Sequence, residues 1–272
     1  MMQQETVQVL WNTHECSGYY RMGLGGPAAC AGSEPGQFVM VRLPEGTGPL
    51  LRRPFSIHRL IRSAGRIEGI ELLYKVVGAG TRLLSRMDRG DGLDVVGPLG
   101  KGFTVPKGME RAFLVAGGIG VAPMFFLGSV LHQRGVDPAN CTVFIGGGSR
   151  DDLLCVNDFF TAGMRTLQLA TEDGSAGERD RVTGPLERAM AVDRPDRIYA
   201  CGPLAMLRAV ARIAHGAGVP CEISVESMMA CGMGACLGCA VGDRNHPDRY
   251  LHACIDGPVF DTRVIDLEGG GI

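Results

Sequence analysis

The chain has 272 residues, of which 45% are hydrophobic, and its 27 Lys and Arg nearly balance 29 Asp and Glu. This length and hydrophobic content are sufficient for two medium domains or three small ones with buried cores. A formal net charge of −2 provides no broad basic surface, so we expect no nucleic-acid partner.

The longest apolar run, Val121 to Leu131, is too short to cross a bilayer, and no basic stretch followed by an apolar one opens the chain. We therefore expect a cytoplasmic protein with no membrane partner. Four of the ten cysteines crowd between residues 231 and 254, which in a reducing compartment indicates metal binding rather than disulfides. The others are expected to be small buried side chains: Cys16, Cys30, Cys141, Cys155, Cys201 and Cys221.

Residues 1–103 contain short apolar stretches separated by Gly and Pro. We expect strands at 6–11, 38–43, 57–62, 70–77 and 93–96, with one helix at 81–87. Short, regularly spaced strands with turn signals between them predict a small antiparallel β-barrel.

Residues 104–218 alternate between apolar strands and longer helical stretches. We expect strands at 112–116, 141–145, 167–171 and 197–200, and helices at 122–133, 151–160, 185–190 and 204–215. This alternation predicts a parallel sheet covered on both faces, which binds nucleotides at the carboxyl ends of its strands.

Residues 219–272 are rich in Gly, Cys, Asp and Met and form a segment too small to build its own core. Cys231, Cys236 and Cys239 have the spacing Cys-x4-Cys-x2-Cys, and Cys254 follows after fourteen intervening residues. This is the spacing of plant-type [2Fe-2S] ferredoxins, and the small residues between the thiols let backbone N–H groups approach the sulfurs. The alternative is a structural zinc site, but such a site pairs two Cys-x2-Cys knuckles and only one is present here.

Two motifs in the barrel region suit a flavin. The first is Arg53-Pro54-Phe55-Ser56, whose guanidinium group suits a pyrophosphate and whose hydroxyl suits the edge of a flavin ring. The second runs from Leu73-Tyr74-Lys75 to Gly80-Thr81, where a Gly-rich turn opens a helix. Either motif alone fits a solvated arginine or a turn with Thr81 as its N-cap. Their joint occurrence ahead of a nucleotide-type domain favours FAD.

Two strand ends in the second region suit a nicotinamide nucleotide. The strand at 112–116 leads into Gly117, Gly118 and Gly120 and then a helix, a context that suits a pyrophosphate. It is not the Gly-x-Gly-x-x-Gly fingerprint, so a turn without a ligand stays open. Later, Cys201, Gly202 and Pro203 follow another strand at the same edge of the sheet.

Two further loops bear on the choice of nucleotide. Ser149-Arg150 offers a possible 2′-phosphate site, which leaves the choice between NADH and NADPH open. The acidic pair Glu172-Asp173 follows a third strand and is also consistent with a simple turn.

These motifs, in this order, resemble the ferredoxin–NADP reductase superfamily over nearly the whole chain. Within it, the stretches Glu226–Cys236 and Cys254–Phe260 are similar to the electron-transfer subunits of dihydroorotate dehydrogenase B (the PyrK family). Residues 267–272 contain no aromatic of the kind that stacks on the flavin in free-standing reductases, so the cover of the flavin is left unidentified.

The resemblance implies an α+β multidomain protein with an FAD barrel (1–103), an NAD(P) domain (104–218) and a [2Fe-2S] domain (219–272). It implies electron transfer from NADH through FAD and the cluster to a separate FMN-containing dihydroorotate dehydrogenase subunit of pyrimidine biosynthesis, with no catalytic residues beyond the cofactors. The alternatives are a related subunit with another partner, of the bifurcating ferredoxin–NADP reductase, sulfide dehydrogenase or hydrogenase type, and a zinc-stabilised binding module without catalysis.

Overall fold

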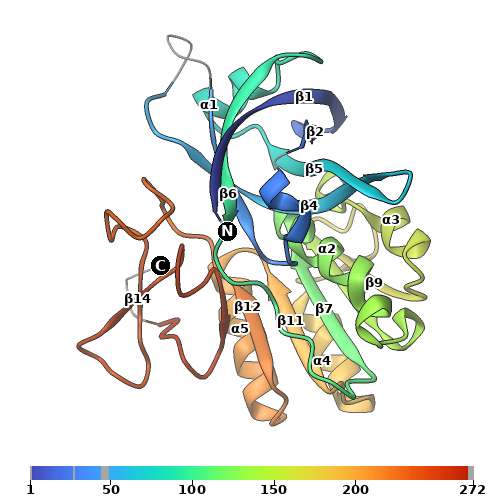
Figure 1. The fold of residues 1–272 in the computed structure, drawn as a ribbon. Helices are drawn as coiled ribbons and strands as arrows, with labels where there is room; N and C mark the ends of the chain where they lie inside the picture. Colours follow the sequence, from blue (N-terminus) through green and yellow to red (C-terminus); the bar gives the residue numbers. More distant parts are fainter. Residues whose placement is uncertain (1, 27, 44–48, 269–272) are drawn as a thin grey trace.

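The computed structural model describes residues 2–26, 28–43 and 49–268, and it has a barrel, a large sheet and an irregular C-terminal segment (Figure 1). The barrel is closed and antiparallel, in the order β1-β2-β5-β4-β3-β6. Its strands are β1 (Gln3–Cys16), β2 (Tyr19–Gly25), β3 (Phe38–Arg42), β4 (Arg53–Ser63), β5 (Arg66–Lys75) and β6 (Gly92–Leu99). The predicted barrel is thus confirmed.

The strand β2 is absent from the sequence prediction. Its glycines hide it, because glycine is unfavourable inside strands and lowers the local signal. Gly23 is required by the packing, since a Cβ atom there would lie 2.4 Å from Cε2 of Trp11 on the neighbouring β1. A tertiary contact therefore selects the residue that obscures the strand.

The barrel's helix, α1 (Ala79–Leu84), begins and ends earlier than predicted. Its N-cap is Gly78, so the interpretation of Thr81 as N-cap is wrong. Thr81 is the third residue of the helix, and its Oγ1 accepts hydrogen bonds from the backbone N–H groups of Val77 and Gly78. The hydroxyl thus satisfies donors of the preceding turn from inside the helix.

The second unit is a seven-stranded sheet in the order β10-β9-β8-β7-β11-β12-β15, parallel except for β15. Its strands are β7 (Ala112–Gly117), β8 (Thr142–Gly147), β9 (Thr166–Thr171), β10 (Glu178–Arg179), β11 (Arg197–Cys201), β12 (Cys221–Ser224) and β15 (Val259–Asp261). Its helices are α2 (Val121–Leu131), α3 (Val156–Thr161), α4 (Thr183–Val192) and α5 (Leu204–Gly216), and short 3-10 turns accompany them. The continuous helix predicted at 151–160 is wrong. Residues Arg150–Asp152 form a 3-10 turn, and Cys155 in the left-handed conformation (φ 61°) separates it from α3.

Alternate residues of the central strands pack on opposite faces of this sheet. Leu114 and Tyr199 share a core with α2 and α3, whereas Phe113 and Ile198 share another with α5. The barrel lies against α2, since α2 contacts β4 across the interface. Both faces are therefore buried, as the sequence predicts.

The sheet continues beyond residue 218, the predicted end of the nucleotide domain. β12 and β15 belong to it, and between them the chain forms the small hairpin β13 (Ala240–Gly242) and β14 (Tyr250–His252). Val241, Ala253 and Ile265 are fully buried in a core that also contains Met40 of the barrel and Ile223 of β12. The C-terminal segment thus buries its apolar residues against the other two units, and the predicted boundaries stay predictions.

A buried cluster of charged and polar side chains joins the barrel to α3. Arg21 donates to Asp158 at 2.6 Å, and Arg59 lies 2.9 Å from Glu71, which is 2% exposed. His58 is fully buried beside them, with its Nε2 3.6 Å from a Glu71 oxygen and its Nδ1 3.3 Å from the Ala122 carbonyl. Burial, reinforced by the positive charges of Arg21 and Arg59, lowers the pKa of His58 to about 3.

This cluster predicts an acid-dependent loss of stability. A histidine of the unfolded chain titrates near pH 6.5, so between that pH and about 3 the unfolded state binds one more proton than the folded state. Stability then falls as the pH falls, by up to about 1.4 kcal/mol per pH unit. His58→Asn should flatten the plot of unfolding free energy against pH between pH 6 and 4.

The measurement is urea-induced unfolding at several pH values. His132→Asn provides the control, because His132 is exposed. Burial raises the pKa of Glu71, which makes stability fall as the pH rises, the opposite of the His58 effect. Glu71 is present in the wild type and in both variants. Equal slopes for wild type and His58→Asn would show that His58 does not titrate in this way.

Candidate functional site

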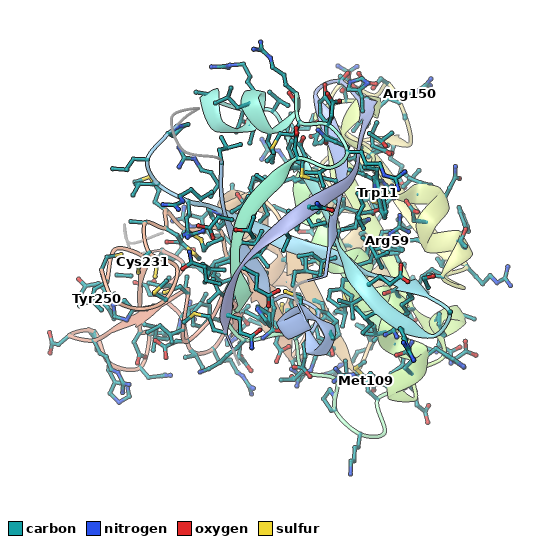
Figure 2. The ribbon with its side chains drawn as sticks, turned by 45° about the horizontal axis from the view of Figure 1, so that its top comes forward. Trp11, Arg59, Met109, Arg150, Cys231 and Tyr250 are labelled. Carbon is teal, nitrogen blue, oxygen red and sulfur yellow. The ribbon has the colours of Figure 1, made fainter. Side chains whose placement is uncertain are left out.

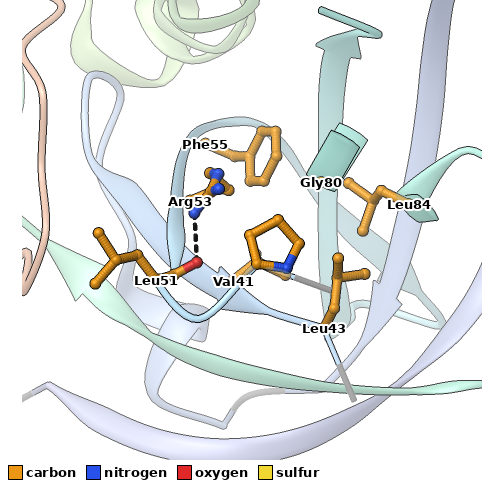
Figure 3. Close-up of a pocket in the computed structure, with 8 residues that line it drawn as sticks. Val41, Leu43, Leu51, Arg53, Phe55, Gly80 and Leu84 are labelled. Atoms are coloured by element: carbon orange, nitrogen blue, oxygen red, sulfur yellow. Dashed lines mark hydrogen bonds between the residues drawn. The ribbon is translucent and has the colours of Figure 1, made fainter. Parts of the chain in front are cut away.

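A cavity of about 370 Å³ lies between the barrel and the carboxyl edge of the sheet. Its barrel side combines the beginning of β4 with the end of β5, which are adjacent because these strands pair antiparallel. All of the predicted flavin residues except Gly80 line it, namely Arg53, Pro54, Phe55, Ser56, Leu73, Tyr74, Lys75 and Thr81. Gly80 lines a small adjoining hollow together with Arg53 and Phe55 (Figure 3).

Two adjacent arginines where β4 begins, Arg52 and Arg53, have different environments. Arg52 is held by Asp94, with its Nη2 2.7 Å from the carboxylate. Arg53 donates to the backbone carbonyl of Leu51, and its guanidinium group lies beside the hollow (Figure 3). Arg53 therefore remains available to an anionic ligand, whereas Arg52 neutralises a carboxylate of the barrel.

Tyr74 forms an apolar wall of the cavity. Its hydroxyl donates to Asn12 Oδ1 at 3.0 Å, and its ring stacks on Tyr20 with a centroid distance of 5.6 Å. Burial raises the pKa of Tyr74 above its usual range. The side chain thus offers shape and a fixed ring rather than a proton.

Lys75 joins the barrel to the nucleotide unit. Its Nζ lies 3.2 Å from Asp152 Oδ1, and the same oxygen accepts a 2.7 Å hydrogen bond from the hydroxyl of Tyr19. Burial raises the pKa of Asp152, but the hydrogen bonds from Tyr19 and Lys75 outweigh burial. The pKa of Asp152 is therefore below its usual range. Tyr19 and Asp152 were not singled out in the sequence, and no spacing motif would have found them, since they meet only across the interface.

The wall opposite the barrel comes from the chain that leaves β12. It consists of Ser224, Val225, Glu226, Ser227 and Met229, with Pro258 and Cys201 beside them. These wall residues were not predicted, because the nucleotide domain was expected to end at residue 218. The available signal was the apolar stretch at 219–225, whose carboxyl end meets the same edge as the other parallel strands.

A second cavity of about 750 Å³ continues along the sheet edge. Gly117, Gly118 and Pro203 line it, together with Gly146, Gly147 and Gly148 after β8. Lys75, Ile119 and Glu226 line both cavities. The two spaces are therefore adjacent, which suits two ligands that exchange electrons.

The predicted nicotinamide residues divide between these spaces. Gly120 and Cys201 line the smaller cavity, and Gly202 is in neither lining. Gly120 has a packing reason, since a Cβ atom there would lie 2.2 Å from the Cys201 carbonyl oxygen. Cys201 is 3% exposed, and burial raises its pKa to about 12.

The possible 2′-phosphate site has a different geometry from the one expected. The Arg150 backbone N–H and guanidinium group both donate to Ser175, at 2.8 and 3.1 Å, and Arg150 does not line the larger cavity. Glu172 does line it. The Arg150 side chain thus braces the 173–175 turn.

The four clustered cysteines lie on the C-terminal segment, and Figure 2 shows Cys231 and Tyr250 on the opposite side of the molecule from Arg59 and Arg150. Cys239 and Cys254 are buried with their sulfurs 3.2 Å apart, while Cys236 is exposed. Backbone N–H groups of Met233 and Cys236 point at the Cys231 sulfur, each at 3.4 Å.

Additional backbone donors reach the other thiols, with Gly234 N–H 3.2 Å from the Cys254 sulfur and Gly238 N–H 3.5 Å from that of Cys236. Burial raises the pKa of Cys231, but its N–H donors outweigh this and lower it to about 7. Such donors stabilise thiolates, the form that binds iron.

Among the described residues no three His, Cys, Asp or Glu side chains meet as ligands of one metal ion. A [2Fe-2S] cluster needs its four thiolates spread around two irons.

Comparison with known proteins identifies the three units. Models of an oxidoreductase FAD-binding domain and an oxidoreductase NAD-binding domain match residues 7–103 and 114–212. The model for the iron–sulfur cluster binding domain of dihydroorotate dehydrogenase B matches residues 226–266, which include all four clustered cysteines. The protein is therefore an oxidoreductase subunit that binds FAD, NAD(H) and an iron–sulfur cluster, and the zinc alternative is not supported.

Full-length relatives decide the family. A protein of Listeria monocytogenes serovar 1/2a is 38% identical over 98% of this chain and 100% of its own length. One of Desulforamulus reducens is 38% identical over 89% of this chain and 90% of its own. Both are named dihydroorotate dehydrogenase B (NAD(+)), electron transfer subunit. The chain belongs to this family.

Solved structures show the same fold. The structure described as an NADH-dependent reduced ferredoxin–NADP oxidoreductase has a TM-score of 0.82 and 25% identity, covering 96% of this chain and 90% of that one. A ferredoxin–NADP⁺ reductase from Neisseria gonorrhoeae with bound FAD and NADP has a TM-score of 0.64 and 18% identity, covering 79% of this chain and 92% of that one. No helix within the described ranges of this electron transfer subunit has the length and apolar character needed to span a membrane.

The different environments of Arg53 and Arg52 predict different effects on flavin binding. Arg53→Gln should raise the dissociation constant of FAD about tenfold or more, because one charge-assisted hydrogen bond to a pyrophosphate is lost. Arg52→Gln is the matched control, and its FAD affinity should stay within about threefold of wild type, because Asp94 already occupies its guanidinium group. Reconstitution of the apoprotein with FAD, followed by flavin fluorescence, measures both constants. Equal losses in the two variants would contradict the assignment of Arg53.

Proposed function

We propose that this subunit passes electrons from NADH, through FAD and a [2Fe-2S] cluster, to or from the FMN of a catalytic dihydroorotate dehydrogenase subunit in pyrimidine biosynthesis. When bound, FAD exchanges electrons in pairs with the nicotinamide and singly with the cluster, which makes it the converter between the two. The observation that supports the proposal best is the continuity of the chain from the flavin cavity to the thiols. Met229 lines the cavity, and Cys231 is two residues further along.

The protein's own residues provide positioning. Lys75, Ile119 and Glu226 line both cavities, so they border the place where a nicotinamide would meet the flavin. The Lys75–Asp152 ion pair and the Tyr19–Asp152 hydrogen bond hold the two cavities in one orientation. A fixed orientation of two bound reactants is a large part of catalysis when the cofactors provide the chemistry.

The four thiols are proposed to hold the cluster, with Cys239 and Cys254 on its buried side and Cys236 on its exposed side. Three large apolar side chains close in sequence to the thiols are exposed: Met228 is 90% exposed, Leu237 58% and Ile255 49%. Such residues at a surface indicate a protein partner. We propose that the catalytic subunit covers this face, which would place its cofactor near the cluster.

The described residues form the barrel, the sheet and the C-terminal segment, and a dihydroorotate-oxidising barrel takes roughly 250 residues. The proposal therefore assigns the oxidation of dihydroorotate to a separate catalytic subunit. All ten cysteines are unpaired in the structure, which supports a reducing, cytoplasmic location.

A second partner type has one observation in its favour. The solved structure at TM-score 0.82 is that of an NADH-dependent reduced ferredoxin–NADP oxidoreductase, so a subunit of this fold also occurs in another electron-transfer assembly. The identities of 33–38% to dihydroorotate dehydrogenase B subunits favour the first proposal.

Cys236→Ser tests the route through the cluster. The variant should retain rapid reduction of FAD by NADH, because no residue of either cavity is changed, but electron delivery to the catalytic subunit should fall at least a hundredfold. Stopped-flow flavin spectra and coupled dihydroorotate assays measure the two steps. Cys16→Ser is the control, since Cys16 is the last residue of β1 in the barrel, outside the cluster of four cysteines at 231–254, and its substitution should leave both steps unchanged. Normal delivery by Cys236→Ser would contradict the route.

An anaerobic pull-down from the native cells tests the partner. We expect the tagged subunit to recover an FMN-containing dihydroorotate dehydrogenase and to show flavin and iron–sulfur absorbance. The same absorbance with a different dehydrogenase would keep the electron-transfer role and contradict the pathway.

A further inference from the structure

A third cavity lies between α5 and the C-terminal segment, next to the larger of the two cavities described above. Its volume is about 260 Å³. Helix α5 contributes Arg208, Arg212 and His215, which lie on one side of the helix because they are spaced by four and three residues. The C-terminal segment contributes Arg244, Thr262, Leu267 and Glu268.

The charges in this cavity are unbalanced. Three guanidinium groups face one carboxylate among the described lining residues, which gives 3 − 1 = +2 without His215. Arg208 donates to the Leu267 carbonyl and lies 3.8 Å from Glu268, a side chain that is 68% exposed. Within the described ranges, Arg212 and Arg244 have no hydrogen-bond or ion-pair partner for their guanidinium groups. Both side chains are exposed, so their N–H groups are left to solvent or to a bound anion.

We propose that this cavity binds a small dianion, a phosphate group carried by a small molecule. The charge of +2 matches a phosphate monoester, and arginine presents paired N–H groups that fit its oxygens. The space of about 260 Å³ accommodates a phosphate with a short attached group.

The cavity is separate from the nucleotide space but shares a wall with it. Arg208 and Arg212 line both cavities, whereas His215, Arg244 and Thr262 line only the smaller one. The site therefore bridges α5, which begins directly after Cys201-Gly202-Pro203, and the segment that carries the four clustered cysteines. A bound dianion would hold these two parts together. Because Arg244 lines this cavity and not the nucleotide space, its substitution tests this site alone.

The test uses the full chain, purified anaerobically with its cofactors, and inorganic phosphate as the probe. Calorimetric titration at constant ionic strength should show saturable binding of one phosphate with a dissociation constant of about a millimolar or less. Arg244→Gln should weaken it about tenfold or more while leaving the NADH KM within twofold, because Arg244 does not line the nucleotide space. Arg179→Gln, at an exposed arginine of β10, is the matched control and should bind phosphate as wild type does.

Arg212→Gln is the second variant and should also weaken phosphate binding, so the test does not depend on one substitution. Absence of saturable binding to the wild type, or equal affinity in Arg244→Gln and Arg179→Gln, would overturn the proposal. Unchanged phosphate affinity in Arg244→Gln combined with weaker association with the catalytic subunit would also overturn it, and would identify the arginines as part of a protein interface.

Discussion

The arrangement of the whole protein depends on the antiparallel pairing of β15 with β12. Glu222, Ile223 and Ser224 pair with Asp261, Phe260 and Val259, so the chain leaves the edge of the sheet and returns to the same edge. Two backbone hydrogen bonds close the return, from Val225 N–H to the Pro258 carbonyl at 2.9 Å and from Lys101 N–H to the Gly257 carbonyl at 2.6 Å. The cysteine-rich segment is thus anchored at both ends, and its outgoing residues become a wall of the flavin cavity.

This anchoring lets a segment with little regular structure remain folded. Its buried side chains, such as Val241 and Ile265, share a core with β3 and β12, and each buried aliphatic side chain contributes about 1.5–3 kcal/mol. The cysteine loop also sits directly on the barrel, because Gly232 has φ +72° and a Cβ atom there would lie 2.4 Å from Met40 Cγ. Cluster binding would add to a fold that tertiary packing already supports.

The contact between the barrel and the nucleotide unit combines an apolar core, which includes Phe126 of α2, with buried charged side chains. Arg21, Arg59, Glu71 and Asp158 neutralise one another in a largely buried cluster, and Lys75 and Asp152 form a second pair closer to the cavities. Buried ion pairs contribute little net stability but strongly disfavour arrangements in which one partner is left uncompensated. They therefore fix the relative orientation of the two cavities, on which electron exchange between flavin and nicotinamide depends.

The sequence by itself determined the three kinds of unit and their order, the four clustered cysteines proposed as cluster ligands and nearly all of the predicted flavin residues that line the cavity on its barrel side. These depend on local patterns: strand spacing, the strand–helix alternation, the cysteine spacing and motifs of two to four adjacent residues. Only the tertiary structure decided that β12 and β15 extend the sheet and that Ser224–Ser227 and Met229 line the flavin cavity. It also decided that Thr81 lies inside its helix and that Arg150 donates to Ser175 and does not line the nucleotide space. Those features depend on contacts between residues distant in sequence, such as Gly23 with Trp11, Gly120 with Cys201 and Tyr19 with Asp152, and a local pattern contains no information about such contacts.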